Sequence, residues 1–192
     1  MSISATVTLS MSMDLGPLVD AVARQGKAAA GEPPLKEEQL QAVRQAVVQD
    51  VAAEVKRGSE ATKARLRSSL TKGVKLLDVT SQQDGLVVTS HTRLAIDDLA
   101  LLPQIAFAAE DGSAALHPFA GFKVATQGGT TKVEGRSPKL PKAPGARGEM
   151  VLVLETKDAP ASHNASSAAG GRLEWRGPLD GAEFPVKVTF QS

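Results

Sequence analysis

The chain of 192 residues is 42% hydrophobic and 22% charged, a composition typical of globular proteins that excludes a wholly disordered chain. Its 22 basic and 21 acidic side chains leave a net charge of +1, too little for a general attraction to nucleic acid. The absence of cysteine excludes disulfides, thiolate nucleophiles and zinc sites with cysteine ligands. We therefore predict one globular domain over residues 1–192.

The N-terminal segment is predicted to form a strand followed by a short helix. Over residues 3–13, apolar residues alternate with serine and threonine, which gives a strand one buried and one solvated face. A turn at residues 14–17 ends the strand, and Pro17 suits the first turn of a helix. Leu18 and Val22 give this helix an apolar side.

The next segment predicts two more helices. From Lys36 onward, apolar residues recur at helical spacing, which indicates a long amphipathic helix packed on a sheet. The apolar positions are Leu40, Val43, Val47, Val51 and Val55. Gly58-Ser59 interrupts the pattern, and we predict that Ser59 caps a further helix, which carries Leu66 and Leu70 and ends at Gly73.

The segment that follows predicts a hairpin and a capped helical turn. Residues 74–79 and 86–96 are expected to be antiparallel strands joined by a tight turn at Asp84-Gly85. Asp97 or Asp98 then suits the cap of a short helix, because aspartate accepts hydrogen bonds from the first free N–H groups of a helix.

The C-terminal third predicts further strands. Gly128-Gly129 indicates a second hairpin, and residues 150–154 are apolar on both faces, as in a central strand. Residues 173–175 and 186–190 supply two final strands. Taken in chain order, these elements predict an α+β fold, with a mostly antiparallel sheet and two to three amphipathic helices packed on one face.

A basic, proline-rich segment at residues 137–148 is predicted to be an extended, mobile loop. Its basic residues are either solvated or in contact with anionic lipid headgroups. The candidates for membrane-surface contact are Arg136, Lys139, Lys142 and Arg147. The segment has no aromatic residues that could stack on bases, so we predict no nucleic-acid partner.

The residues that could carry chemistry do not form a known catalytic pattern. The three histidines, His91, His117 and His163, belong neither to a nucleophile elbow nor to a zinc-binding helix motif. The adjacent Asp97 and Asp98 suit a helix cap better than a metal site or an acid–base pair. We therefore predict that the protein is not an enzyme and needs no metal or cofactor. A hydrolase that uses His163 with a nearby serine is the alternative.

Several short signatures follow one another in a specific order. They are Gly73-Val74-Lys75, Asp84-Gly85-Leu86-Val87-Val88, Asp97-Asp98-Leu99, and Asn164-Ala165 followed by a glycine pair and Leu173-Glu174-Trp175. In this order they resemble the LppM-type lipoprotein domain of bacterial envelopes. The resemblance implies a mature lipoprotein domain outside the cytoplasmic membrane, held there by a lipid anchor that this chain lacks, with lipid or glycolipid as its ligand. It implies no catalytic residues. Without an export signal, the location would be cytoplasmic.

Two functions follow as hypotheses. The first is an envelope-associated domain that binds lipid or glycolipid in an apolar groove between the helices and the sheet. The candidate lining residues are Leu18, Val22, Val43, Val47, Leu66 and Leu70, which would be plain core if the domain were closed. The alternative is a structural or protein-interaction module of an envelope assembly, in which residues 3–13 or 186–190 form a strand edge open to a partner.

Overall fold

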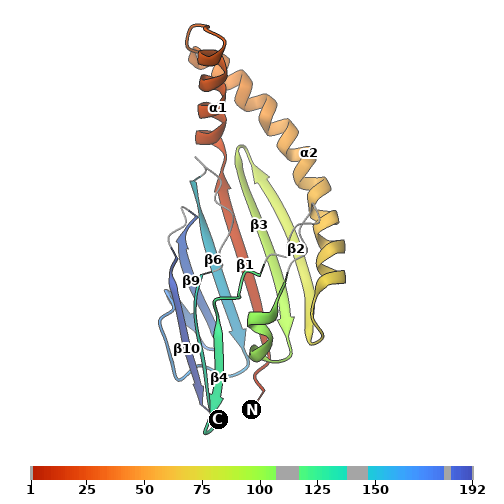
Figure 1. The fold of residues 1–192 in the computed structure, drawn as a ribbon, viewed down its shortest axis with the longest axis vertical. Helices are drawn as coiled ribbons and strands as arrows, with labels where there is room; N and C mark the ends of the chain where they lie inside the picture. Colours follow the sequence, from red (N-terminus) through yellow and green to blue (C-terminus); the bar gives the residue numbers. More distant parts are fainter. Residues whose placement is uncertain (1, 107–116, 138–146, 180–182, 192) are drawn as a thin grey trace.

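A computed structural model of the protein describes residues 2–106, 117–137, 147–179 and 183–191. The chain is an α+β fold with mostly antiparallel strands in two sheets (Figure 1). The six-stranded sheet contains, in spatial order, β2 (Val74–Asp84), β3 (Val87–Ile96), β1 (Ala5–Asp14), β6 (Arg147–Thr156), β9 (Arg172–Pro178) and β8 (Ser167–Ala169). The four-stranded sheet contains β4 (Lys123–Gln127), β5 (Thr130–Arg136), β10 (Pro185–Gln191) and β7 (Ser162–His163). The helices are α1 (Gly16–Ala29), α2 (Glu37–Ser69) and the 3₁₀ helix η1 (Leu99–Gln104).

The two sheets pack face to face and enclose the main core. We call the side of the six-stranded sheet that faces the four-stranded sheet its inner face, and the opposite side its outer face. From the inner face, Val7, Leu152 and Trp175 meet Val133 and Val188 of the smaller sheet, and each of these side chains is at most 3% exposed. The space left between them is about 10 Å³, no more than a single water needs. The region between the sheets is therefore a closed core.

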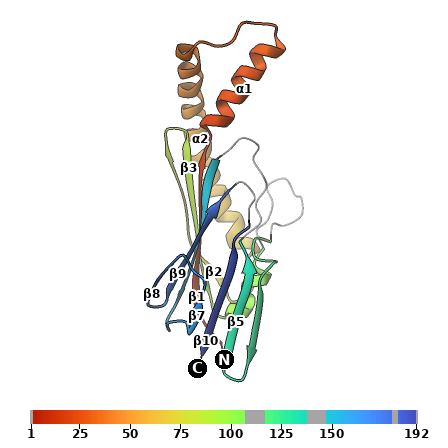
Figure 2. The same cartoon turned by 90° about the vertical axis from the view of Figure 1, so that its left-hand side faces the viewer.

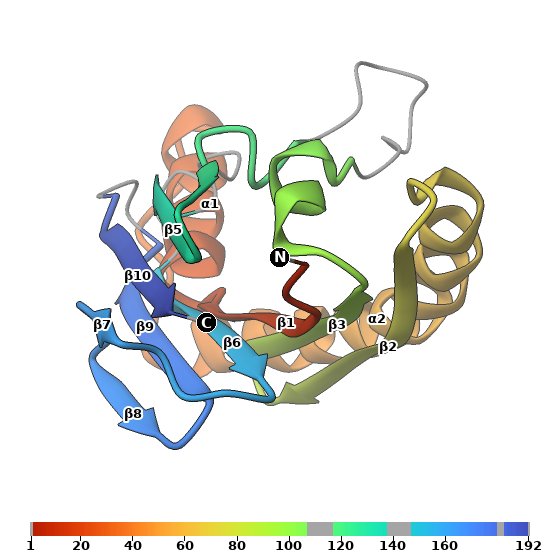
Figure 3. The same cartoon turned by 90° about the horizontal axis from the view of Figure 1, so that it is seen from below.

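The smaller sheet does not extend over the whole inner face. Figure 2 shows it against the lower part of the six-stranded sheet, the end where both termini lie. Seen from below, α2 stands beside β2 at one side of the inner face, β5 and β10 cover the other side, and η1 lies between them (Figure 3). The upper part of the inner face, near the β2–β3 hairpin, thus lies beyond the sheet-on-sheet contact.

The turns predicted from the sequence are confirmed. Gly85 has a φ of 58°, which favours glycine, and it joins β2 to β3. The Asp98 side chain accepts a hydrogen bond of 3.0 Å from the Ala100 N–H at the start of η1. The central position predicted for residues 150–154 is also confirmed, because β6 lies between β1 and β9. Of the loop predicted at 137–148, residues 138–146 lie outside the described residues, whereas Arg147 and Gly148 begin β6.

Two predictions about neighbouring elements are wrong. Residues 3–13 and 186–190 do not form open edges, because β1 lies between β3 and β6 and β10 lies between β5 and β7. Alternation of apolar and polar residues reports the two faces of a strand, and it carries no information about which strands flank it. The break predicted at Gly58-Ser59 is also absent, since α2 is continuous over 33 residues. A glycine inside a helix costs only about 1 kcal/mol, which the flanking helix-forming residues offset.

The two long helices form a hairpin that extends past the upper end of the sheets (Figure 1). α2 packs along β2, and α1 packs against α2 but has no buried residue. Arg44 of α2 joins the two helices by donating hydrogen bonds of 2.8 and 2.6 Å to the Asp20 carboxylate of α1. These hydrogen bonds lower the pKa of Asp20 below its ordinary value, although partial desolvation opposes the shift.

Candidate ligand-binding site

The upper part of the inner face carries a mixed apolar and polar surface, which we call the inner patch. It consists of Met11, Met13, Ser81, Gln83, Val88 and Ser90. The strand register aligns these side chains in two rows, Ser81–Ser90–Met11 and Gln83–Val88–Met13. All six are half-buried, in contrast to the core residues of the same face farther down. The inner patch is therefore accessible, although it continues the surface that forms the closed core.

The polar side chains of the inner patch have unused hydrogen-bonding groups. Within the described parts of the chain, the hydroxyls of Ser81 and Ser90 make no hydrogen bond. The Gln83 side-chain N–H group donates to the Val48 carbonyl of α2 at 2.9 Å and to the Gly85 carbonyl at 2.8 Å. Its Oε1 atom, however, is buried without a partner. A buried acceptor of this kind is costly unless a donor reaches it, and a ligand hydroxyl or amide would supply one.

The predicted lining residues fall into two groups. Leu18, Val43 and Val47 are half-buried in the α1–α2 hairpin, and Val22 of α1 is 59% exposed. Leu66 and Leu70 belong to the opposite end of α2, where Leu66 is 4% exposed and Leu70 packs against the core. At 1.5 Å per residue, about 35 Å of helix separates Val43 from Leu66. One ligand cannot contact both groups without spanning most of α2.

The predicted membrane contacts are only partly visible. Arg136, at the end of β5, has a side chain that is 74% exposed and forms an ion pair of 3.3 Å with Glu183. Arg147 is exposed at the start of β6. Lys139 and Lys142 lie outside the described residues.

The three histidines are spread over the fold. His91 on β3 lies on the outer face, with its Nδ1 atom 2.7 Å from the Ser10 hydroxyl oxygen. A serine and a histidine that act together in catalysis need a further residue that orients the imidazole ring. Among the described residues, His91 has a hydrogen bond with Ser10 and with no other side chain, so this arrangement is incomplete. His117 is exposed, and His163 accepts a hydrogen bond of 3.2 Å from the nearby Ala165 N–H. No set of three or more metal-binding side chains occurs among the described residues.

The outer face also carries a network of ion pairs around Glu174. Glu174 is 7% exposed, and its carboxylate accepts hydrogen bonds from Arg172 at 2.9 Å and from Arg176 at 2.6 Å. Burial raises the pKa of Glu174, but the hydrogen bonds and charges of Arg176 and Arg172 outweigh it, and the pKa lies below its ordinary value. The carboxylate therefore stays ionised in the folded protein.

This lowered pKa predicts a loss of stability in acid. A carboxyl group with a lowered folded-state pKa stabilises the fold above its unfolded value of about 4.3, and that contribution disappears as the pH falls through the folded value. At pH 7 we expect Glu174→Gln to lower the free energy of unfolding by about 1–2 kcal/mol. The difference from the wild type should shrink below pH 4 in urea titrations. Glu134→Gln, at an exposed carboxylate, is the matched control. A difference that is equally large at pH 3 would contradict this role of Glu174.

Comparison of the chain with protein-family models, with curated proteins and with solved structures finds no match. The resemblance to LppM-type lipoproteins therefore stays a prediction. In the part of the chain that the structure describes, no helix has both the length and the hydrophobicity needed to cross a membrane.

Sequence reasoning missed the inner patch, although a signal for it was present. In β2 the inner positions change from Val79, which is 3% exposed, to Ser81 and Gln83. This change marks the point where the closed core ends. It could be recognised only once the register had shown which residues share the inner face, because the bulge between Leu76 and Asp78 shifts the alternation by one residue.

Proposed function

We propose that the chain is a non-catalytic binding domain of the bacterial envelope, and that its ligand is a lipid or glycolipid held at the inner patch. The observation that carries this proposal is the half-buried surface of Met11, Met13 and Val88 next to unpaired hydroxyls on the same sheet face. Because these methionines are neither sealed in the core nor fully solvated, they form an apolar surface that a ligand can cover.

The chemistry of the inner patch suits an amphipathic molecule. Methionine side chains are flexible and polarisable, so Met11 and Met13 can adapt to an acyl chain. Ser81, Ser90 and the free Gln83 oxygen can exchange hydrogen bonds with ester, amide or sugar groups. In this proposal α2 packs on the sheet beside β2 and forms the wall of the inner patch. The envelope location and the lipid anchor rest on the resemblance to LppM-type domains.

The proposal is tested by filling the inner patch. We expect Ser90→Phe to weaken binding of a phospholipid with a fluorescent acyl chain at least tenfold, because the added ring occupies the space of the ligand. Thr89→Phe is the matched control, since Thr89 is the next residue on β3 and belongs to the outer face. Fluorescence titration measures binding, and thermal unfolding shows that both variants are folded. Met13→Gln, which keeps the length of the side chain but removes its apolar character, should also weaken binding. Equal affinities for the wild type and both patch variants would refute the proposal.

A second candidate is a protein-interaction module of an envelope assembly. Among the described strands, β4 pairs with β5 alone and ends the four-stranded sheet. η1 packs beside β4, and a partner strand would pair with the part of the β4 edge beyond that contact. Co-purification from the source cell tests this function. A partner that stays bound when Thr126 is changed to Pro would not be using the β4 edge, because the Thr126 N–H points away from β5 and proline removes that donor.

A further inference from the structure

The side of the four-stranded sheet that faces away from the core is basic, and we call it the basic face. Lys123 on β4, Lys132 on β5 and Lys187 on β10 are exposed on this side. The register places Glu134 between Lys123 and Lys187. Within the described parts of the chain, none of the three lysines makes an ion pair.

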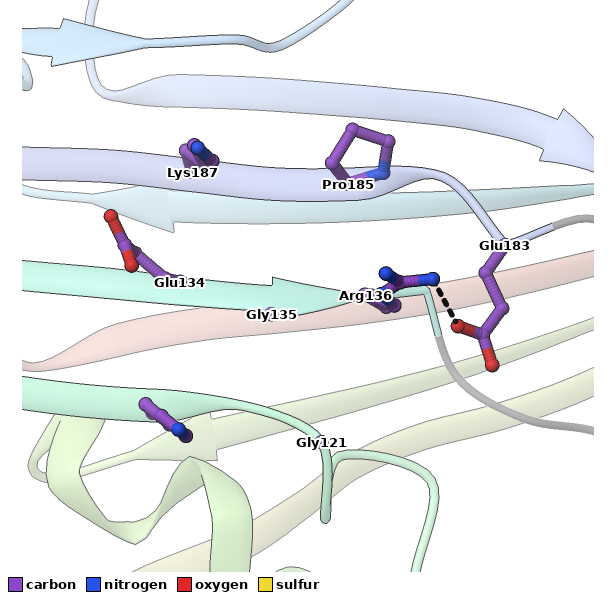
Figure 4. A pocket seen from close by; sticks show the side chains of 8 residues that line it. Gly121, Glu134, Gly135, Arg136, Glu183, Pro185 and Lys187 are labelled. Carbon is purple, nitrogen blue, oxygen red and sulfur yellow. Dashed lines mark hydrogen bonds and ion pairs between the residues drawn. The ribbon is translucent and has the colours of Figure 1, made fainter.

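The basic face is also hollowed. A shallow, open depression of about 740 Å³ lies over it, between Lys123 and Lys187, with glycine backbone at Gly121 and Gly135. Figure 4 shows Lys187 and Glu134 on neighbouring strands, with Arg136 turned toward Glu183 at the rim. The depression is larger than a single small headgroup, and five of its eight described lining residues are charged.

Charge pairing distinguishes the basic face from the outer face of the six-stranded sheet. On the outer face, Arg93 pairs with Glu155 at 3.1 Å, and Arg172 and Arg176 both pair with Glu174. Paired charges cancel at short range, so this surface attracts ions of either sign weakly. The lysines of the basic face have no such partners, and their field extends into solvent.

We propose that the basic face docks on the surface of an anionic phospholipid bilayer. This face has a net charge of +2, compared with +1 for the whole chain. The net charge is the sum over four basic side chains, Lys123, Lys132, Arg136 and Lys187, and two acidic ones, Glu134 and Glu183. Each basic side chain close to an anionic leaflet strengthens binding about fivefold.

The shape and composition of the basic face favour a membrane surface over nucleic acid. Its strands present charges over a broad, shallow and open surface that an array of headgroups can contact, and none of the exposed large hydrophobic residues described in the structure lies on these strands. Its described outward-facing side chains include no aromatic residue for stacking on bases. The contact is therefore electrostatic, and no side chain of the basic face inserts into the hydrocarbon layer of the membrane. It is independent of the inner patch, so either proposal can fail without the other.

The test is co-sedimentation of the full chain with vesicles of phosphatidylglycerol and phosphatidylcholine, against vesicles of phosphatidylcholine alone. We expect binding to the anionic vesicles only, with a loss at high salt. The triple variant K123E/K132E/K187E should bind at least tenfold more weakly, and the neutral K123Q/K132Q/K187Q should fall between it and the wild type. The matched control K72E/K75E/K157E changes the net charge equally at three exposed lysines elsewhere, and it should keep most of the binding. Ser90→Phe should bind vesicles like the wild type.

Three outcomes would overturn the proposal. The first is failure of the wild type to bind anionic vesicles at low salt. The second is an equal loss in both triple glutamate variants, because net charge and not the basic face would then decide binding. The third is tight binding of a DNA duplex through the same lysines without binding to vesicles, which would assign the face to nucleic acid. Circular dichroism of each variant shows whether the fold is retained.

Discussion

Trp175→Ala is expected to lower the free energy of unfolding by about 3–5 kcal/mol, the range for removal of a large buried aromatic side chain. Trp175 is 2% exposed and lines the closed core between the sheets. Its indole N–H also donates to the Asn164 side-chain oxygen at 2.8 Å. The alanine variant loses both the packing and this hydrogen bond. Urea unfolding followed by far-ultraviolet circular dichroism measures the change.

Trp175→Phe separates the two contributions. It keeps most of the buried ring but removes the indole donor, and we expect a loss of about 1–2 kcal/mol. The Asn164 oxygen retains a second donor, the Lys187 backbone N–H at 2.7 Å, so it is not left unsatisfied. A loss below 1 kcal/mol for Trp175→Ala would show that the two sheets do not pack around this residue.

Gly148→Ala should have the second large effect, a loss of about 3 kcal/mol, at the upper end of the range for overpacking. A Cβ atom at Gly148 would lie 2.1 Å from the Ser12 carbonyl oxygen and 2.7 Å from the Leu179 side chain. The first contact is with the backbone of β1, which pairs with β6 at this point, so no side-chain rotation relieves it. The two strands would have to separate locally. Thermal and urea unfolding of the purified variant measure the cost.

Gly121→Ala is the matched control for this substitution. A Cβ atom at Gly121 would meet no heavy atom within 4 Å, and its φ is not in the left-handed region. We expect a change within about 1 kcal/mol, since alanine there also reduces the entropy of the unfolded chain. If both variants were equally stable, the close approach of β1 to β6 would not restrict residue 148.

The parts of the fold that were predictable from sequence depend on local chemistry. The alternating pattern of β1, the turn at Gly85 and the cap by Asp98 each follow from a few consecutive residues. The division into two sheets and the central place of β1 depend on pairing between distant segments, and no local pattern encodes it. The continuity of α2 through Gly58 was missed because a weak helix breaker was given too much weight.

The candidate site was less predictable than the fold. The apolar stripe predicted a helix packed on a sheet, and α2 contacts the edge strand β2. However, Val43 and Leu66 are too far apart along α2 to line one site. Ser81, Ser90 and Met11 come together only through the pairing of three strands. Lys123, Lys132 and Lys187 likewise gather through the pairing of β4, β5 and β10. A surface formed by side chains of several paired strands can be recognised only when the strand register is known.

The attachment of α1 has a consequence for access to the helical end of the protein. Because α1 has no buried residue and is tied to α2 by the partly exposed Arg44–Asp20 pair, its detachment costs much less than unfolding of the sandwich. The helical end can thus open and reclose while the closed core stays intact. Entry and exit of a bulky molecule at this end would then require only a local fluctuation.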